Sequence, residues 1–125
     1  MLVAKFVIGD ESAKAELNVS QLSGTGGGIL ANVNRWRNQL GLPPLNEGDL
    51  TQQVRSFDVP GGKAMLVDMS GNDPKTGQKA RLLGAIVPQS EQSWFYKLMG
   101  NEQVIERERE VFTRFLKTTT YSNVP

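Results

Sequence analysis

The chain has 125 residues, of which 38% are hydrophobic and 22% charged, and this length and composition predict one folded domain, residues 1–125. Fourteen Lys and Arg against thirteen Asp and Glu leave a net charge of +1, without the basic excess typical of nucleic-acid binding, so we expect no nucleic-acid partner. The sequence contains no cysteine and no histidine, which excludes Ser-His-Asp and Cys-His nucleophiles and Cys/His zinc sites. The composition still allows catalysis by carboxylate, Lys, Arg or Tyr side chains, or binding without catalysis.

The sequence does not determine the cellular compartment of the protein. No run of 18 or more apolar residues is present, so we expect no membrane span. The N-terminus lacks the basic start, apolar middle and small-residue cleavage site of a signal peptide. Met1 leads almost directly into a strand-like segment, which fits a cytoplasmic protein or one from which an export signal has been removed. The oligomeric state is not determined by any pattern.

The first half of the chain predicts a β-hairpin followed by two helices. Apolar residues alternate at period two over 2–8 and again over 15–19, with a turn expected around 9–13. Apolar residues then recur at 3.6-residue spacing, which predicts an amphipathic helix over 28–40. Asn46 is expected to cap a second, short helix.

The second half predicts a strand meander and a terminal helix. Short apolar runs separated by turn residues indicate strands near 55–59, 64–69, 82–87 and 94–99. Several of these runs are apolar on both faces, so both faces of the sheet should be covered. Asn101 is expected to cap a helix over 101–117. The predicted class is α+β, with an antiparallel sheet of about six strands flanked by helices (an α/β/α sandwich) and the order β-β-α-α-β-β-β-β-α.

Two loops hold residue types that bind ligands in other proteins. Gly24–Gly28 precedes a helix as phosphate loops do, but a Walker Lys-Ser/Thr is missing and the dinucleotide fingerprint needs Gly where Ile29 stands. Asp68, Asn72 and Asp73 do not have the spacing of a calcium loop. We interpret the first as a flexible connection and the second as an Asx-rich turn, and predict no metal or cofactor.

One carboxylate falls where the terminal helix should be apolar. At 100° per residue, Glu108 lies within the apolar stripe, whereas Glu106 and Arg109 have the spacing of a solvated ion pair. A buried charge needs a partner, and Arg37 at the edge of the first helix's stripe is the predicted one, with Arg81 as the alternative. The pair would either fix the packing of the elements or form a ligand-binding or acid–base site in a pocket.

Aromatic residues add two further candidates. Trp36 and Trp94, with Phe95 and Tyr96, could stack on a ligand ring, but aromatic residues at such positions usually pack in the core. The candidate ligand-binding residues are Arg37, Glu108, Trp94 and Tyr96. No catalytic residue is assigned.

The segment ANVNRWRNQLGLPP (31–44), together with WFYKLMG (94–100) before the last helix, resembles a group of uncharacterised bacterial proteins of the PsbP-like fold. This is the fold of the photosystem II extrinsic subunit P and of the Ran-binding Mog protein, and the resemblance covers most of the chain. It implies an antiparallel sheet with helices on its faces, no catalytic motif, and a role as a binding or assembly partner. Some bacterial members follow export or lipoprotein signals. The metal-binding histidines of the photosynthetic relatives have no counterpart here.

The leading functional hypothesis is a non-catalytic binding or accessory module for a protein partner or small ligand, with an exposed apolar or aromatic patch. The alternative is a small enzyme that uses a perturbed carboxylate, Glu108 with Arg37 and Tyr96, in a shared pocket. A third hypothesis is a chaperone or carrier for hydrophobic segments or lipids, which requires an open apolar groove.

Overall fold

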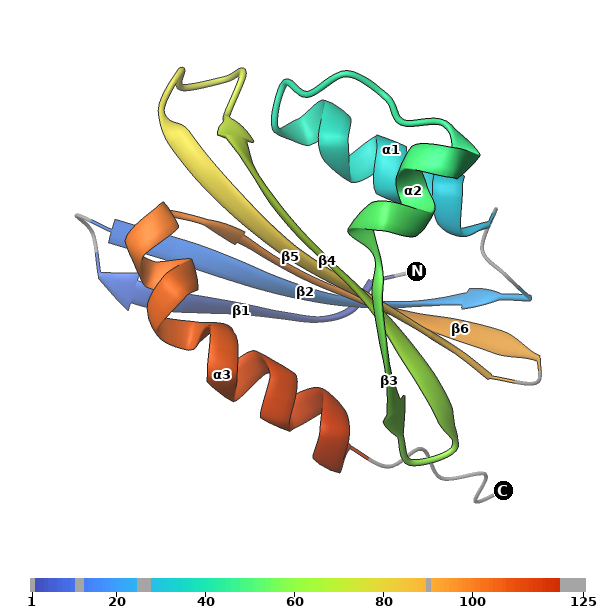
Figure 1. The fold of residues 1–125 in the computed structure, drawn as a ribbon. Helices are drawn as coiled ribbons and strands as arrows, with labels where there is room; N and C mark the ends of the chain where they lie inside the picture. Colours follow the sequence, from blue (N-terminus) through green and yellow to red (C-terminus); the bar gives the residue numbers. More distant parts are fainter. Residues whose placement is uncertain (1, 11–12, 25–27, 90, 120–125) are drawn as a thin grey trace.

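A computed structural model gives the fold and describes residues 2–10, 13–24, 28–89 and 91–119. Its elements, shown in Figure 1, are β1 (Leu2–Asp10), β2 (Ala13–Ser23), α1 (Ile29–Gln39), α2 (Glu47–Gln53), β3 (Arg55–Val59), β4 (Gly62–Asn72), β5 (Lys79–Pro88), β6 (Gln92–Gly100) and α3 (Glu102–Thr118). The predicted α+β class and element order are confirmed. The predicted hairpin turn and glycine-rich connection fall partly on residues 11–12 and 25–27, which lie outside the described residues.

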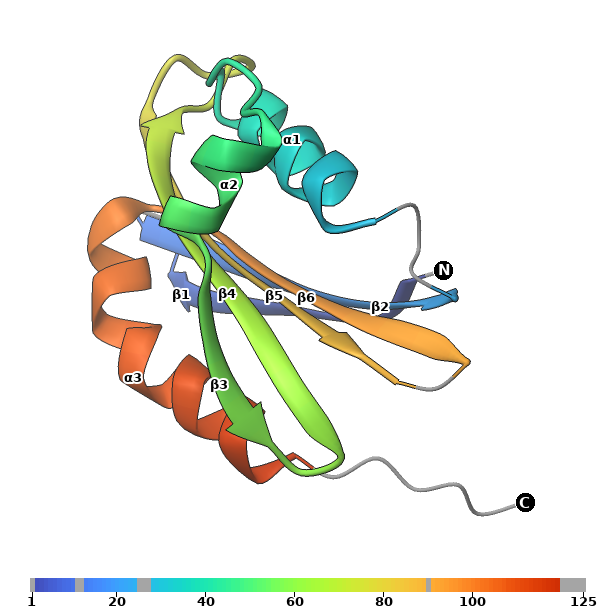
Figure 2. The same ribbon diagram turned by 45° about the vertical axis from the view of Figure 1, so that its right-hand side comes forward.

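The six strands form one antiparallel sheet in the order β1-β2-β6-β5-β4-β3. β3 to β6 follow one another as a meander, and β6 then pairs with β2, so β1 and β3 are the two edges. Helices α1 and α2 lie on one face of the sheet and α3 lies on the other (Figures 1 and 2). The result is three layers, as the two-faced apolar pattern of the central strands predicts.

Each face of the sheet has its own core. On the α3 side the buried helix residues are Val104, Ile105, Phe112 and Leu116. On the α1 side the buried helix residues include Val33, Trp36 and Leu50. The buried apolar residues of α1 and of α3 recur at the 3.6-residue spacing that the sequence predicts. No helix within the described ranges is long and apolar enough to cross a membrane.

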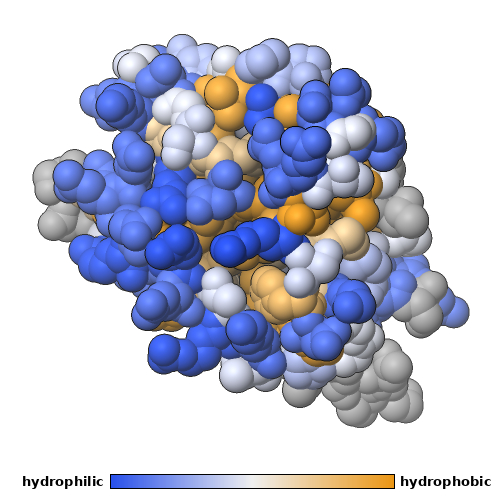
Figure 3. Space-filling view, viewed as in Figure 1, coloured by the Kyte–Doolittle hydropathy of each residue, from blue (hydrophilic) through white to orange (hydrophobic). Residues whose placement is uncertain are grey.

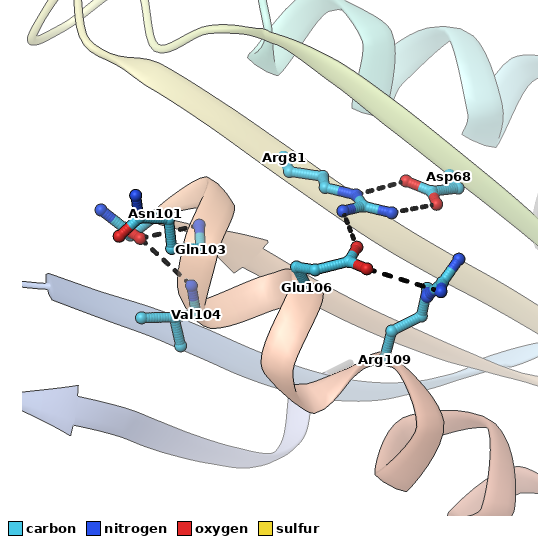
Figure 4. A network of polar contacts seen from close by, with 7 residues as sticks. All are labelled: Asp68, Arg81, Asn101, Gln103, Val104, Glu106 and Arg109. Carbon is cyan, nitrogen blue, oxygen red and sulfur yellow. Dashed lines mark hydrogen bonds and ion pairs between the residues drawn. The ribbon is translucent and has the colours of Figure 1, made fainter.

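Two asparagine caps define where helices begin. The side chain of Asn101 accepts hydrogen bonds from the backbone N–H groups of Gln103 and Val104 at the start of α3 (Figure 4). Asn46 accepts from the N–H of Asp49 at the start of α2, at 2.8 Å. Both caps were predicted, since an Asx side chain satisfies N–H groups that have no partner within the helix.

Strands β4 and β5 are longer than their apolar runs. Pairing continues through Ser70 with Arg81 and Asn72 with Lys79, so the connection between the strands predicted near 64–69 and 82–87 is shorter than the sequence indicates. Backbone pairing does not require apolar side chains, and polar residues extend both strands. This extension places the β4–β5 loop beside the end of α1, where the N–H of Asn72 donates to the carbonyl of Leu40 at 2.9 Å.

Helix α1 packs closely against the sheet at a glycine of β5. A Cβ placed on Gly84 of β5 would lie 2.2 Å from a ring carbon of Trp36, so only glycine leaves room for the indole. Trp36 is buried, which confirms its prediction as a core residue. This ring is one of the contacts through which α1 packs on the sheet, together with Val33 of the same helix.

Candidate functional site: a cationic groove beside helix α1

A polar groove lies on the α1 side of the sheet. Two adjoining hollows of about 820 Å³ and 450 Å³ share Glu16, Asn18, Gln39 and Lys97 among their lining residues, and we call the continuous depression the α1 groove. It extends from the β4–β5 loop to the far end of β2. Hydrophilic residues predominate at the left of Figure 3, where the β4–β5 loop and the turn-proximal ends of β1 and β2 lie.

Strand β2 supplies one side of this groove through the alternation of its side chains. Ala15 and Val19 point into the core beneath α3. Because successive strand residues face opposite sides, their neighbours point to the α1 side. The β2 residues of this alternating set that line the groove are Lys14, Glu16, Asn18, Ser20 and Leu22, and Ala13 at the start of the strand lines it as well.

Lys97 lies at the centre of the groove. In the sheet it stands between Asn18 of β2 and Gly84 of β5. Trp36 fills the space above Gly84, so Lys97 marks the boundary between the covered and the open parts of this face. Its Nζ donates to Oε1 of Gln39 on α1 at 2.9 Å.

The electrostatic environment of Lys97 disfavours its own charge. Burial lowers the pKa of the Lys97 ammonium, and the nearby Arg35 lowers it further, while Glu16 acts in the opposite direction. Glu16 is also shared with Lys5, 3.5 Å away on the neighbouring strand. The Lys97 side chain is half-buried, and the acceptor of its ammonium hydrogen bond is the neutral amide of Gln39.

Positive charge is concentrated around this groove. Among the described residues its lining contains two acidic ones, Glu16 and Asp73. Its basic residues are Lys5, Lys14, Arg35, Lys75, Lys79 and Lys97. Elsewhere the described residues comprise eight basic and ten acidic side chains, which is a negative balance. A net charge of +1 thus conceals a polarised molecule, and anions will be attracted to this side.

The β4–β5 loop, which carries Lys75 and leads into Lys79 at the start of β5, is held by an Asx turn. Oδ1 of Asp73 accepts the N–H of Lys75 at 2.8 Å, and the Asp73 N–H donates to the carbonyl of Gln78 at 2.8 Å. The predicted Asx-rich turn is confirmed at this aspartate. Across the described ranges no three acidic side chains gather in a way that could hold a metal ion.

The predicted Glu108–Arg37 ion pair is wrong. Arg37 lies on α1, where it is buried and its Nε donates to the carbonyl of Pro43 at 2.6 Å. Glu108 lies on α3, on the other face of the sheet, and its nearest basic partner is the adjacent Arg107 at 3.4 Å. The helical projection shows which side of a helix faces inward, but not which face of the sheet the helix covers.

The aromatic candidates Trp94 and Tyr96 also belong to the α3 side. Tyr96 is buried, and its ring meets that of Phe115 edge to face at 5.8 Å. Trp94 packs against the same core. Arg37 is thus separated from the other three candidate residues by the sheet, and the four do not form one site.

The alternative partner of Glu108 is engaged elsewhere. Arg81 donates to both carboxylate oxygens of Asp68 at 2.8 and 2.6 Å and to Glu106 at 2.5 Å (Figure 4). The hydrogen bonds to Asp68 raise the pKa of Arg81 above its usual value, and the hydrogen bond from Arg81 lowers the pKa of Glu106. The predicted contact between Glu106 and Arg109 is present at 3.5 Å. Arg81 therefore has the structural role of joining α3 to the sheet.

Lys97 was not selected as a candidate from the sequence, although its position between apolar residues of the same strand face could have indicated it. Phe95, Lys97 and Met99 share one face of a strand, and the first and last pack in the core beneath α1. A lysine between two apolar residues at period two is unusual for a covered face. It indicates a position at the margin of a helix, where the ammonium can reach a groove.

Comparison with known proteins found no matching family, no matching curated protein and no matching solved structure. The PsbP-like resemblance therefore stays a prediction. Function is inferred from the groove and its charges.

Proposed function

We propose that this chain is a non-catalytic binding module that holds an extended acidic segment of a partner protein in the α1 groove. The observation that carries this proposal is the half-buried ammonium of Lys97 at the centre of a groove lined by five further basic residues. A desolvated cation beside a neutral acceptor regains favourable energy when a carboxylate binds. The groove is therefore suited to anions.

The dimensions of the groove favour a peptide over a compact ligand. Its floor follows β2 from Lys14 to Leu22, which corresponds to about 26 Å at the usual rise of a strand. This is the length of about eight extended residues. The side-chain amides of Asn18, Asn38 and Gln39 line the same groove and can both donate to and accept from a peptide backbone.

The other two hypotheses find less support in the geometry. An enzyme using Glu108 with Arg37 and Tyr96 requires one pocket for all three, and these side chains are distributed over both faces of the sheet. A carrier of hydrophobic segments requires an apolar groove, whereas this one is lined largely by charged and amide side chains. The PsbP-like resemblance also implies a binding role, by analogy of fold.

The proposal is tested with a fluorescently labelled octapeptide of Asp and Glu, titrated with the full chain and followed by anisotropy. We expect binding that weakens as salt is added, because the charges on the groove are partly screened. Lys97→Met should weaken it roughly tenfold, since it removes the central charge and retains the aliphatic stem.

A matched control is Lys63→Met, which removes a lysine outside the groove that pairs with Asp58 at 3.2 Å. It should bind the peptide as the unmodified chain does. The proposal fails if Lys97→Met binds equally well, or if a peptide of Ser and Gln with the same length binds as tightly as the acidic one.

A further inference from the structure

Exposed large hydrophobic side chains are concentrated on one strand. Among the described residues six such side chains are exposed, and two of them, Val111 and Phe115, lie on α3. The other four lie on β1 and are Leu2, Val3, Phe6 and Val7. An apolar strand at the margin of a sheet is an unusual surface for an isolated domain.

Strand β1 is also an edge of the sheet. It pairs with β2 on one side only, so the backbone groups of its other side have no strand partner within the described chain. Edge strands are normally protected by charges, by shortness or by bulges. The opposite edge, β3, has five residues and exposes Arg55 and Asp58, whereas β1 has nine residues and its one irregularity lies near its beginning.

We propose that β1 pairs antiparallel with β1 of a second copy of this chain about a two-fold axis at Phe6, which joins two six-stranded sheets into one. Phe6 is the midpoint of Leu2–Asp10, so this register uses the whole strand. It places the two Phe6 rings side by side, and Ala4 opposite Ile8 of the second copy. A two-fold axis makes one patch complementary to itself, and an aromatic pair across two strands is favourable.

The charges near β1 are compatible with this register and disfavour the register centred on Lys5. Lys5 is the single charged residue between Leu2 and Gly9. With the axis at Phe6, each Lys5 lies opposite Val7 of the second copy, and that Val7 is paired with Glu16 on β2. Lys5 of one copy and Glu16 of the other then lie in the same cross-strand row of the joined sheet, so opposite charges are aligned. An axis at Lys5 would instead place two ammonium groups opposite each other, which is unfavourable.

The hydrogen bonds available are sufficient for a specific interface. An antiparallel pair forms roughly one N–H···O bond per residue, so two nine-residue strands would form about nine. A typical protein–protein interface has about ten. A second copy therefore accounts for the bare edge, the exposed apolar side chains and the charge pattern together.

The absence of native cysteine allows a position-specific test. Phe6→Cys should form a covalent dimer rapidly under a mild oxidant, because side chains at the two-fold axis have Cβ atoms about 5 Å apart. Val111→Cys is the matched control, since Val111 is as exposed as Phe6 at 55% but lies on α3. It should cross-link at least roughly tenfold more slowly.

The unmodified chain should also elute at twice the monomer mass in size-exclusion chromatography with light scattering. Val7→Lys places an ammonium opposite Lys5 of the second copy at two symmetric positions, so the dimer dissociation constant should rise roughly tenfold. Val111→Lys should leave the dimer intact. The proposal is overturned if the unmodified chain is monomeric up to high concentration, or if Val111→Cys cross-links as fast as Phe6→Cys. A monomer that binds some other protein along β1 would also overturn it.

Discussion

The guanidinium of Arg81 on β5 donates to Glu106 on α3, with 2.5 Å between Nη1 and Oε2 (Figure 4). Its Nε and Nη2 atoms hold both carboxylate oxygens of Asp68 on β4. This bidentate geometry depends on the planar fork of arginine, which lysine cannot reproduce. One side chain thereby links two strands to the terminal helix.

Replacing this arginine should destabilise the fold. Arg81→Gln removes the bidentate partner of Asp68 and leaves Glu106 with Arg109 alone, and the Arg81 side chain is only 13% exposed. We expect the free energy of unfolding to fall by about 1–3 kcal/mol, measured by urea denaturation at pH 7. Arg107→Gln, which removes an exposed arginine of α3, should change it by less than about 0.5 kcal/mol. Equal losses in the two variants would contradict the role assigned to Arg81.

The same contact predicts an acid-dependent loss of stability. The hydrogen bond from Arg81 lowers the pKa of Glu106 below its usual 4.5, so the folded state binds fewer protons than the unfolded state near that pH. The stabilisation is complete above pH 4.5 and is lost as the pH falls through the lowered pKa. The difference in unfolding free energy between the unmodified chain and Glu106→Gln should therefore disappear in acid. A difference that persists at low pH would contradict the stabilisation assigned to the Arg81–Glu106 contact.

Much of the fold could be predicted because its determinants are local. The period-two and 3.6-residue patterns gave the element order, and the caps Asn46 and Asn101 follow from the chemistry of a single side chain. The strand order was not predicted. It depends on β6 pairing with β2, which brings Val19 opposite Tyr96, and neither strand carries a local signal for so distant a partner.

The candidate site was predicted less well because it depends on which face each helix covers. The helical projection placed Glu108 toward the inner side of α3, and its side chain is indeed only 24% exposed. Arg37, however, lies on the opposite face of the sheet. Arg81 does bind a carboxylate of α3, but that carboxylate is Glu106, which lies near enough to the margin of the helix to reach β5.

A single methyl group should displace α1. In Gly84→Ala the new Cβ would lie 2.2 Å from the ring of Trp36, so either the indole or the helix must move. Overpacking of this kind costs about 1–3 kcal/mol, measurable as a lower midpoint of urea denaturation. Since Gln39 lies on the same helix, the α1 groove should lose its shape and bind the acidic octapeptide more weakly.

Gly48→Ala provides the control for Gly84→Ala. Gly48 lies in α2, where a Cβ would meet its nearest neighbour at an ordinary 3.5 Å. The higher helix propensity of alanine should make this variant up to about 1 kcal/mol more stable. If Gly84→Ala were equally stabilising, the close packing of Trp36 on the sheet would be wrong.

The last prediction concerns the pH dependence of Lys97. Burial lowers its pKa below the usual 10.5, so between the lowered value and pH 10.5 the unfolded state binds more protons than the folded state. The unmodified chain should therefore gain stability relative to Lys97→Met as the pH rises through this window, measured by urea denaturation at several pH values. Parallel stability curves for the unmodified chain and Lys97→Met would mean that the folded state does not disfavour this charge. The bound acidic octapeptide should abolish the trend, because a carboxylate beside Nζ restores the pKa that burial lowers.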